Sequence, residues 1–317
     1  MVPMHHSYPL GDNRVVTLDP TAAWLTELVA DVAPVGPAAL SGLSPVESLV
    51  RRTTPSGAEL ALVRDVVVKL HHPRTDAGAL ATRLRAVVQG AGSALWVQPL
   101  DDSLHRSPDG RVATVWPRVD VLEESEAALP WVDAGRLLAA LHLSDSGAAG
   151  DPSTGGLPPQ GGPARVARAL IRVDASDHPS APMVARLGAH LLDEATAPPR
   201  RETIVHGDWH LGQLARTDDG LRLLDVDDLG TGDPAWDLAR PAGLWAAGML
   251  EDAAWESFLA AYRDAGGPAV PGDGDPWPHL DLPARCAVFV AAVRTLTVQH
   301  THSADPADAL LEACARM

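Results

Sequence analysis

The sequence predicts an α+β protein of two lobes, in which a small amino-terminal lobe combines a sheet with helices and a larger carboxy-terminal lobe is mainly helical. Short β-type runs recur between residues 46 and 116, whereas apolar residues recur with the period of an α-helix after residue 120. The chain has 317 residues, of which 46% are hydrophobic, so it can fill a sizeable core without disulfides. We therefore expect one lobe over residues 1–117 and the other over residues 118–317.

The amino-terminal lobe is expected to start with a helix and to continue as neighbouring antiparallel strands. Pro20 suits the first turn of a helix over residues 20–32, because the missing N–H of proline is not needed there. Runs of strand-forming residues follow, with a turn at Pro55-Ser56-Gly57, and the last of them is Val66–Leu70. The elements predicted after these strands are a helix at 76–89 and two strands at 94–100 and 112–116.

The carboxy-terminal lobe is expected to consist mostly of helices. Residues 144–164 are rich in Gly, Pro and Ser, which predicts a loop inside this lobe rather than a boundary between domains. Just before this loop lies a helix whose apolar face is made of Trp131, Ala134, Leu137, Leu138 and Leu141. Further helices are predicted at 164–173, 181–195, 235–248, 251–265, 282–300 and 304–315.

Charge and composition exclude several classes of partner. The formal net charge is −16, from 25 Lys and Arg against 41 Asp and Glu, which opposes binding to the phosphate backbone of nucleic acids. No uncharged apolar run approaches the roughly 20 residues of a membrane span, and the first residues lack a signal-peptide pattern. Cys286 and Cys314 indicate reduced thiols. We expect a cytoplasmic protein that binds neither nucleic acid nor membranes, and its oligomeric state stays open.

The residues with the clearest chemistry are those at 206–213, His-Gly-Asp-Trp-His-Leu-Gly-Gln, which follow the short apolar run Ile204-Val205. Gly207 allows a tight turn that presents Asp208, a candidate catalytic base. Gln213 lies five residues later and provides an amide oxygen, which can bind a hard cation without adding charge. This spacing equals that of the catalytic-loop pattern H-R-D-x-x-x-x-N in protein kinases.

A second carboxylate motif follows at a short distance along the chain. Asp225 comes 17 residues after Asp208, at the end of the apolar run Leu221–Leu224. A turn at Asp218-Asp219-Gly220 reverses the chain before this run, so we expect Asp225 to return beside the first loop. Asp208, Gln213 and Asp225 then fit a base and two metal ligands.

Together these motifs resemble the aminoglycoside phosphotransferase and choline kinase-like family, which shares the bilobal protein-kinase fold. The matching features are His206-Gly207-Asp208 with the amide at 213, Asp225 after an apolar strand, and Gly-Asp-Pro-Ala-Trp-Asp-Leu-Ala at 232–239. The resemblance implies transfer of the γ-phosphoryl group of ATP to a hydroxyl of a small molecule, with Mg²⁺. It assigns Asp208 as the base, Gln213 and Asp225 as metal ligands, and Asp227 as an assisting metal ligand. His-Leu-Gly-Gln at 210–213 is similar to the maltokinase-like branch.

The resemblance also assigns residues to the nucleotide. Lys69, the only lysine of the chain, falls where the family has its phosphate-contacting lysine. A lysine on an apolar strand is costly to bury without an anion, which bound phosphates would supply, and the alternative is an edge-strand lysine that faces solvent. Trp116 and Arg118 lie in a segment placed like the one that joins the lobes, whose backbone meets the adenine in the family.

Two features depart from the family pattern, and the acceptor stays open. The helix at 76–89 contains no glutamate to orient Lys69, only Asp76 at its start, and no G-x-G-x-x-G loop occurs in the first lobe. Asp227 and Asp228 favour an amino-bearing, cationic acceptor, whereas the His-Leu-Gly-Gln resemblance points to a sugar. The candidates are aminoglycosides and other antibiotics, amino sugars and sugars.

Two other functions are compatible with parts of the sequence. The alternation of His206, Asp208 and His210 could ligate zinc or iron, but a barrel-like β scaffold for such a site conflicts with the helical second half. We interpret His206 as a structural residue bonded to loop backbone, and His210 as a residue that lines the substrate side or packs. The main alternative is a degenerate kinase fold that binds nucleotide or another ligand without turnover.

Overall fold

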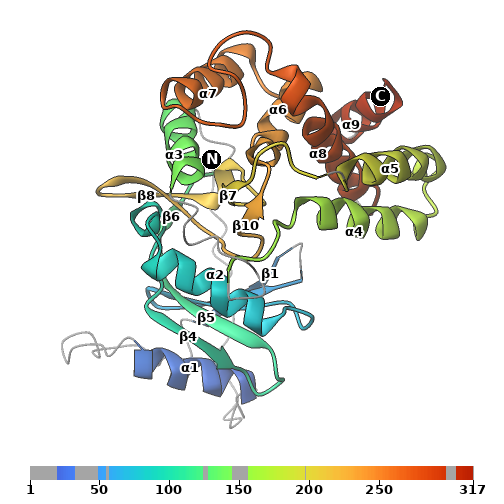
Figure 1. The fold of residues 1–317 in the computed structure, drawn as a ribbon. Coiled ribbons are helices and arrows are strands. Elements are labelled where there is room, and N and C mark those ends of the chain that lie inside the picture. The colour runs from blue at the N-terminus through green and yellow to red at the C-terminus, as the bar shows by residue number, and fades with distance from the viewer. Residues whose placement is uncertain are drawn as a thin grey trace, which may run out of the picture. The chain divides into compact units, whose positions relative to one another are not determined.

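The computed structural model describes residues 20–32, 49–54, 57–123, 128–144, 156–196, 198–297 and 305–316 (Figure 1). Two compact units divide the chain. The first contains Met1–Pro73 and His105–Val115, and the second contains Arg74–Leu104 and Trp116–Met317. The first carries antiparallel strands and the second is mainly helical, so the predicted α+β class is confirmed.

A five-stranded sheet dominates the amino-terminal region, with strand order β1-β2-β3-β5-β4. β1 pairs antiparallel with β2, and β2 pairs antiparallel with β3, as the sequence predicted. The hairpin between β2 and β3 turns at Arg64, whose φ of 57° lies in the left-handed region. The elements of this region are α1 (Pro20–Val32), β1 (Leu49–Thr53), β2 (Glu59–Val63), β3 (Val66–Leu70), β4 (Asp101–Arg106) and β5 (Val112–Pro117).

Helix α1 provides one side of the core of the first unit. Its side chains Leu25 and Leu28 belong to the same buried cluster as Val68 and Leu70 of β3. Leu25, Val68 and Leu70 are completely excluded from solvent, and burying each such side chain contributes about 1.5–3 kcal/mol. The helix at 20–32 therefore forms as predicted because its apolar stripe meets an apolar sheet face.

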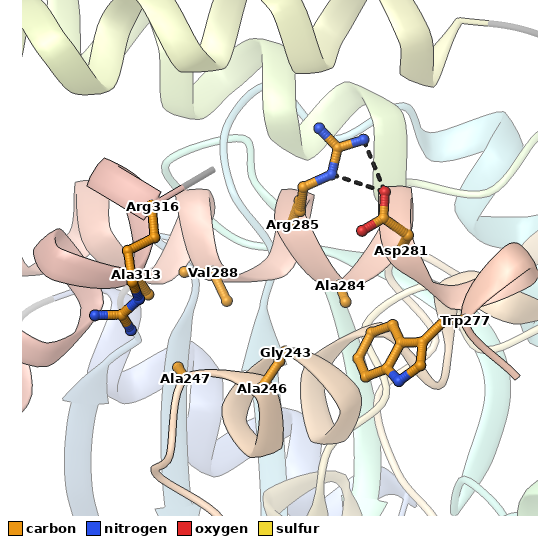
Figure 2. A pocket seen from close by; sticks show the side chains of 10 residues that line it. All are labelled: Gly243, Ala246, Ala247, Trp277, Asp281, Ala284, Arg285, Val288, Ala313 and Arg316. Carbon is orange, nitrogen blue, oxygen red and sulfur yellow. Dashed lines mark hydrogen bonds and ion pairs between the residues drawn. The ribbon is translucent and has the colours of Figure 1, made fainter. Parts of the chain in front are cut away.

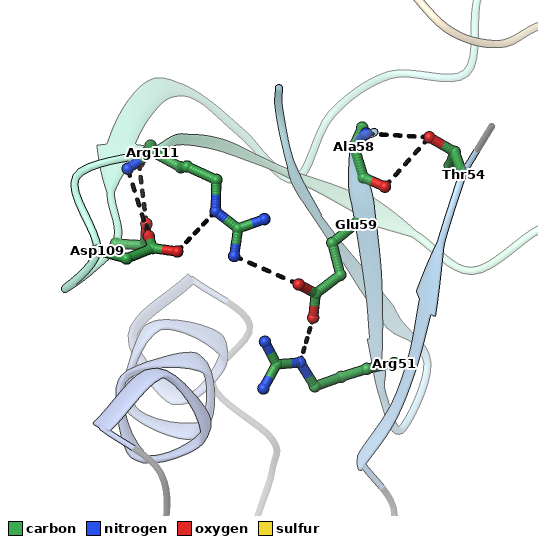
Figure 3. Close-up of polar contacts among 7 residues, drawn as sticks. Arg51, Thr54, Ala58, Glu59, Asp109 and Arg111 are labelled. Atoms are coloured by element: carbon green, nitrogen blue, oxygen red, sulfur yellow. Dashed lines mark hydrogen bonds and ion pairs between the residues drawn. The ribbon is translucent and has the colours of Figure 1, made fainter. Parts of the chain in front are cut away.

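An ion-pair network ties the strands of this unit together (Figure 3). Glu59 on β2 contacts Arg51 on β1, and its other oxygen lies 3.3 Å from Arg111 Nη2. Arg111 also contacts Asp109 at 2.7 Å. The hydrogen bond from Arg51, more than opposing burial, lowers the pKa of Glu59, so the carboxylate stays charged between its two arginines.

The second unit combines small sheets with packed helices. β6, β8 and β9 form one sheet, and β10 pairs with β7 in another. Helix α8 packs against α4, α5, α6 and α9, while α3 packs against α7. Within the described residues, no helix combines the length and the apolar composition needed to cross a membrane. The elements are α2 (Ala77–Gln89), η3 (Ser93–Leu95), β6 (Asp120–Val121), α3 (Trp131–Leu143), α4 (Gly162–Asp174), α5 (Ala181–Ala195), β7 (Thr203–Val205), η6 (Leu211–Gln213), β8 (Leu214–Thr217), β9 (Gly220–Leu223), β10 (Gly230–Gly232), η7 (Pro234–Trp236), α6 (Ala239–Ala246), α7 (Asp252–Asp264), α8 (Trp277–Thr297) and α9 (Asp305–Arg316).

Two predicted elements differ in the structure. The prediction of a strand at 94–100 is wrong. A 3₁₀ turn occupies Ser93–Leu95, and the Gln98 side chain donates a hydrogen bond of 2.7 Å to the Ser93 carbonyl. The strand that pairs in the sheet is β4, farther along the chain. The helix predicted at 235–248 is divided into η7 and α6, because Asp233 caps the short turn and Asp237 ends it.

Candidate active site

The loop that carries Asp208 leaves β7 through Gly207, which no other residue could replace without displacing the neighbouring backbone. Gly207 has a φ of +81°, and a Cβ at this position would lie 2.1 Å from the backbone oxygen of Asp228. Asp208 follows at once, and its side chain is 39% exposed. The tight turn therefore presents the carboxylate to solvent, as the sequence predicted for this glycine.

His206 holds the start of the loop through both ring nitrogens. Its Nε2 donates to the backbone oxygen of Leu224 at 2.7 Å, and its Nδ1 accepts from the backbone N–H of Asp208 at 3.3 Å. The ring also stacks on Trp96 with centroids 5.4 Å apart. The interpretation of His206 as a structural residue is confirmed, and these bonds leave neither nitrogen for a metal ion.

Asp237 holds the backbone of the same loop in place. It is fully buried, and its two carboxylate oxygens accept from the backbone N–H groups of His206 at 2.6 Å and Gly207 at 2.8 Å. Burial raises the pKa of Asp237, but the hydrogen bond from His142 and the other interactions outweigh it, so the pKa lies below its ordinary value. Asp237 therefore braces the loop as an ionised carboxylate.

A chain of hydrogen bonds continues from Asp237 into the core. His142 on α3 donates from Nε2 to Asp237 at 3.0 Å, and its Nδ1 lies 2.8 Å from the hydroxyl of Tyr262 on α7. Tyr262 in turn accepts from the backbone N–H of Ala269 at 3.0 Å. Burial raises the pKa of Tyr262, so the hydroxyl stays protonated and donates to His142. The side chains of Asp237, His142 and Tyr262 therefore each have hydrogen-bond partners.

Asp208 itself pairs with an arginine that the sequence reasoning missed. Arg165, on the first turn of α4, places Nη1 3.1 Å from Asp208 Oδ1. Its Nη2 contacts the Asp228 carboxylate and donates to the backbone oxygen of Gly207 at 2.9 Å. One guanidinium therefore connects the candidate base, the glycine of its turn and a second carboxylate.

Charges around Asp208 pull its pKa in opposite directions. Burial raises the pKa of the Asp208 carboxyl above its ordinary value, and the charge of Arg165 lowers it by a smaller amount. The charge of Asp228 adds to the effect of burial. A carboxylate with a raised pKa is a better proton acceptor, which suits a general base.

Gln213 and Asp225 lie side by side, as the sequence predicted. Gln213 Nε2 is 3.5 Å from Asp225 Oδ2, and the backbone oxygen of Gln213 accepts from the Leu224 N–H at 2.8 Å. The hairpin of β8 and β9, with Thr217 paired to Gly220, returns the chain to this point. Asp225 has a φ of 61°, and its Oδ1 accepts from the Asp227 N–H at 3.0 Å.

This donor set fits a hard divalent cation. It consists of the carboxylates of Asp225 and Asp227, whose backbone N–H donates to Asp225, and the amide of Gln213 beside Asp225. Mg²⁺ is bound by few protein oxygens, with water and phosphate completing its octahedron. In the described part of the chain, no three His, Cys, Asp or Glu side chains come together as a metal-binding group. A Mg²⁺ ion held by Gln213, Asp225 and Asp227 would need water or phosphate oxygens to complete its octahedron.

His210 and Trp209 line the loop after Asp208 in different ways. Trp209 is buried and stacks on Phe258 with centroids 5.0 Å apart. His210 is partly exposed, yet burial of its ring, together with the charges of Arg240 and His206, lowers its pKa to about 2. His210 is therefore a neutral imidazole at any physiological pH.

Residues predicted for the nucleotide lie on β3 and at the end of β5. Lys69 on β3 is 9% exposed, which excludes the alternative of a solvent-facing edge lysine. Asp76 serves as the N-cap of α2, with Oδ1 accepting from Gly78 at 2.8 Å and Ala79 at 3.0 Å. Trp116 is partly buried and Arg118 is exposed.

A separate cavity of about 450 Å³ lies between α6, α8 and α9 (Figure 2). Trp277 closes one end, and Arg285 on its wall pairs with Asp281 at 2.9 Å. Its lining contains none of the residues predicted for the site. The cavity is therefore separate from the loop at 206–213.

Sequence reasoning missed the residues that support the loop from other helices. Arg165 precedes the buried Val166, and Ala169 and Arg172 follow Arg165 by four and seven residues. A basic residue at helical spacing beside an apolar stripe is the signal that could have identified Arg165. His142 continues the apolar stripe of α3, four residues after Leu138, and could have been found in the same way.

Comparisons with known proteins agree on a family and on a fold. The family model described as the phosphotransferase enzyme family matches residues 48–278 of this chain. No curated protein matches the chain in sequence. The similarity to solved structures is therefore at the level of the fold, with identities well below those of close relatives.

Three solved kinases illustrate that similarity. The amicoumacin kinase hAmiN, solved with AMP-PNP, Ca²⁺ and Ami, is 14% identical, with a TM-score of 0.61 and 92% of each chain covered. The choline kinase LicA of Streptococcus pneumoniae is 12% identical, with a TM-score of 0.57 and coverage of 93% of this chain and 97% of that one. A choline/ethanolamine kinase family protein from Mesorhizobium loti is 16% identical, with a TM-score of 0.55 and coverage of 92% and 94%.

Proposed function

The chain belongs to the phosphotransferase enzyme family, and from that premise we propose that it transfers the γ-phosphoryl group of ATP to a hydroxyl of a small molecule. The observation that carries the proposal is the presented carboxylate of Asp208 beside a loop whose end places Gln213 3.5 Å from Asp225. Phosphoryl transfer needs a base or orienting carboxylate and a cation site held together. Asp208, Gln213 and Asp225 are also the residues from which the sequence predicts phosphoryl transfer.

In the proposed reaction, Asp208 orients the acceptor hydroxyl and accepts its proton as the oxygen attacks the γ-phosphorus. The bond from this phosphorus to the bridging oxygen of ADP breaks, and ADP leaves with that electron pair. Arg165 holds Oδ1 of Asp208, which leaves Oδ2 for the hydroxyl. The raised pKa of Asp208 supports its role as proton acceptor.

The nucleotide and metal are assigned to residues with suitable chemistry. Gln213, Asp225 and Asp227 would hold Mg²⁺, which neutralises charge on the transferred phosphates when bound. Lys69, which is 9% exposed on β3, would contact phosphate oxygens with its ammonium group. Trp116 and Arg118 would lie along the nucleotide. We place the reaction in the cytoplasm, where ATP is available and the buried, unbonded Cys286 and Cys314 stay reduced.

The central test replaces the proposed base by its isosteric amide. We expect Asp208→Asn to lower kcat by roughly 10²- to 10⁴-fold while leaving the affinity for ATP with Mg²⁺ nearly unchanged, because the amide cannot accept the proton. Turnover is measured as ADP release with a panel of hydroxyl compounds, and nucleotide binding by calorimetry. Asp219→Asn, on the exposed β8–β9 turn, is the matched control.

Two results would contradict the proposal in different ways. An unchanged kcat in Asp208→Asn would remove Asp208 from the chemistry. Binding of ATP with Mg²⁺ but no transfer to any hydroxyl compound would favour the degenerate fold that binds nucleotide without turnover. The latter alternative is motivated by α2, which contains no acidic residue between Ala77 and Gln89.

A further inference from the structure

The connection between β9 and β10 carries two of the three residues proposed to bind Mg²⁺. Asp225 and Asp227 lie in residues 225–229, which we call the metal segment. Asp225 has a φ of 61°, which a residue other than glycine rarely adopts and which persists only where the surrounding structure holds it. Within the metal segment, the Asp227 N–H donates to Asp225 Oδ1 at 3.0 Å. The position of the two carboxylates therefore depends on contacts that other elements make with the metal segment.

Arg165 of α4 holds the metal segment at Asp228. Its Nη2 contacts the carboxylate of Asp228 and donates to the backbone oxygen of Gly207 at 2.9 Å. The N–H of Gly161, just before α4, also donates to the backbone oxygen of Asp228, at 3.4 Å. Since Nη1 of the same guanidinium lies 3.1 Å from Asp208 Oδ1, Arg165 connects the metal segment with the candidate base.

Arg83 of α2 holds the metal segment at Leu229, the residue next to β10. Its Nε donates to the backbone oxygen of Leu229 at 2.7 Å, although 146 positions separate the two residues in the sequence. Leu229 is only 2% exposed, and a buried carbonyl needs a hydrogen-bond partner from the protein. The Leu229 N–H donates to the backbone oxygen of Val226 at 3.2 Å, so Arg83 contacts the end of a closed turn.

Helix α2 is a fixed support for Arg83. Three of its side chains face the interior, since Leu80 and Leu84 are completely excluded from solvent and Val87 is 1% exposed. Beyond the helix, the Val97 N–H donates to the backbone oxygen of Leu223, at the end of β9, at 3.0 Å. Helix α2 and the metal segment belong to the same compact unit, so Arg83 joins two parts of one folded body.

The charge of Arg83 does not favour metal binding. Burial lowers the pKa of Arg83, and the charges of Asp228, Asp227, Asp76 and Asp225 act against this effect. A guanidinium that is attracted by these carboxylates repels a cation that binds to them. On electrostatic grounds alone, removing the charge of Arg83 should tighten the binding of Mg²⁺. A loss of metal binding on removal of Arg83 would therefore come from the lost hydrogen bond.

We infer that Arg83 is a positioning residue of the proposed Mg²⁺ site, through its hydrogen bond to Leu229. This bond holds Asp225 and Asp227 in place beside Gln213. Contacts from α4 hold the metal segment at one point, and the contact from α2 holds it at another. The inference rests on the proposed function, because it assumes that these three side chains bind Mg²⁺ together with ATP.

The first experiment measures how much Mg²⁺ tightens the binding of AMP-PNP, an ATP analogue that is not hydrolysed. Calorimetry gives the Kd of AMP-PNP with and without saturating Mg²⁺, and the ratio of the two is the gain from the metal. We expect Arg83→Met to reduce this gain roughly tenfold and to leave the Kd without Mg²⁺ unchanged, because methionine reaches as far as Nε but has no donor. Arg85→Met, on the exposed face of α2, is the matched control and should keep the gain.

A second variant separates the hydrogen bond from the charge. Arg83→Gln places an amide N–H at the position of Nε and removes the charge, so we expect it to keep most of the gain from Mg²⁺. Thermal unfolding checks that the variants fold, and Arg83→Gln carries the test if Arg83→Met does not fold. A loss of the gain in Arg83→Gln as large as the loss expected for Arg83→Met would assign the effect to charge and overturn the inference.

The other outcomes separate this inference from the proposed function. An unchanged or larger gain in Arg83→Met would overturn the inference and leave the phosphotransferase function intact. A higher Kd without Mg²⁺, with an unchanged gain, would also overturn it, because Arg83 would then contact the nucleotide. A wild-type protein that does not bind AMP-PNP, or that gains nothing from Mg²⁺, would contradict the proposed function itself. In turnover assays, Arg83→Met should need roughly tenfold more Mg²⁺ for its half-maximal rate, with the KM of the acceptor unchanged.

Discussion

Asp208 and Asp237 are carboxylates that meet the same loop under opposite conditions. Asp237 is fully buried, and both of its oxygens accept backbone N–H groups, so its pKa lies below the ordinary value. Asp208 is 39% exposed, is held through one oxygen by Arg165, and has a raised pKa. The comparison teaches that a saturated carboxylate fixes structure, whereas a carboxylate with a free side can exchange a proton.

The same contrast separates the surroundings of the two residues. Asp237 extends into a closed chain through His142 and Tyr262 to the backbone of Ala269, and each member is satisfied. Asp208, in contrast, shares the guanidinium of Arg165 with Asp228. The closed chain of hydrogen bonds holds the loop in place, whereas the side chain of Asp208 keeps an exposed fraction that a ligand can reach.

The strongest test of this contrast removes the carboxylate of Asp237, which, with His142 and Tyr262, forms the brace of the loop. Asp237→Ala leaves two backbone N–H groups and His142 Nε2 without their acceptor, so we expect the free energy of unfolding to fall by about 3–5 kcal/mol. Urea denaturation followed by fluorescence measures the loss. Asp233→Ala, which removes a single cap bond to Ala235, is the matched control and should cost about 1 kcal/mol. Equal losses in the two variants would contradict the brace.

The brace should also depend on pH in a defined direction. Because the folded pKa of Asp237 is depressed, its contribution is complete above the ordinary carboxyl value of 3.8 and is lost as the pH falls through the lower folded value. The difference in unfolding free energy between wild type and Asp237→Ala should be constant near neutrality and shrink in strong acid. A difference that grows on acidification would reverse the assignment.

A smaller effect is expected from the arginine that holds the base. Arg165→Ala removes a charge that lowers the pKa of Asp208, so this pKa should rise and the acid limb of kcat/KM should move to higher pH. We expect kcat/KM at neutral pH to fall roughly tenfold to a hundredfold. Arg168→Ala on the same helix should change neither the limb nor the rate. A lower rate with an unmoved acid limb would make Arg165 a purely structural residue.

The smallest effect should come from Tyr262, the member of the brace farthest from the loop. Tyr262→Phe removes one donor to His142 and one acceptor for Ala269, so we expect a loss of about 1–2 kcal/mol in the free energy of unfolding. Turnover should be nearly unchanged, because Asp237 keeps its bonds to the loop. Denaturation and ADP release measure the two quantities. A large loss of kcat with unchanged stability would instead connect Tyr262 to the chemistry.

Local patterns were sufficient for most of the helices. Apolar spacing predicted α1, α3 and α5 with the observed bounds at 20–32, 131–143 and 181–195. The prediction of a strand at 94–100 failed because the side-chain amide of Gln98 stabilises a turn there. The β-type composition of the segment does not indicate this turn. The lobe boundary at 117 and the metal and nucleotide residues stay predictions.

The sequence by itself determined the class of the protein and the loop at 206–213, because a base and an amide five residues apart along one turn are a local pattern. It also placed Asp225 beside Gln213, since a hairpin is set by its own turn residues. Only the tertiary structure decided that Arg165 holds Asp208 and that His142 and Asp237 hold the loop. These residues come from segments far apart in the chain, so their contacts depend on how those segments pack.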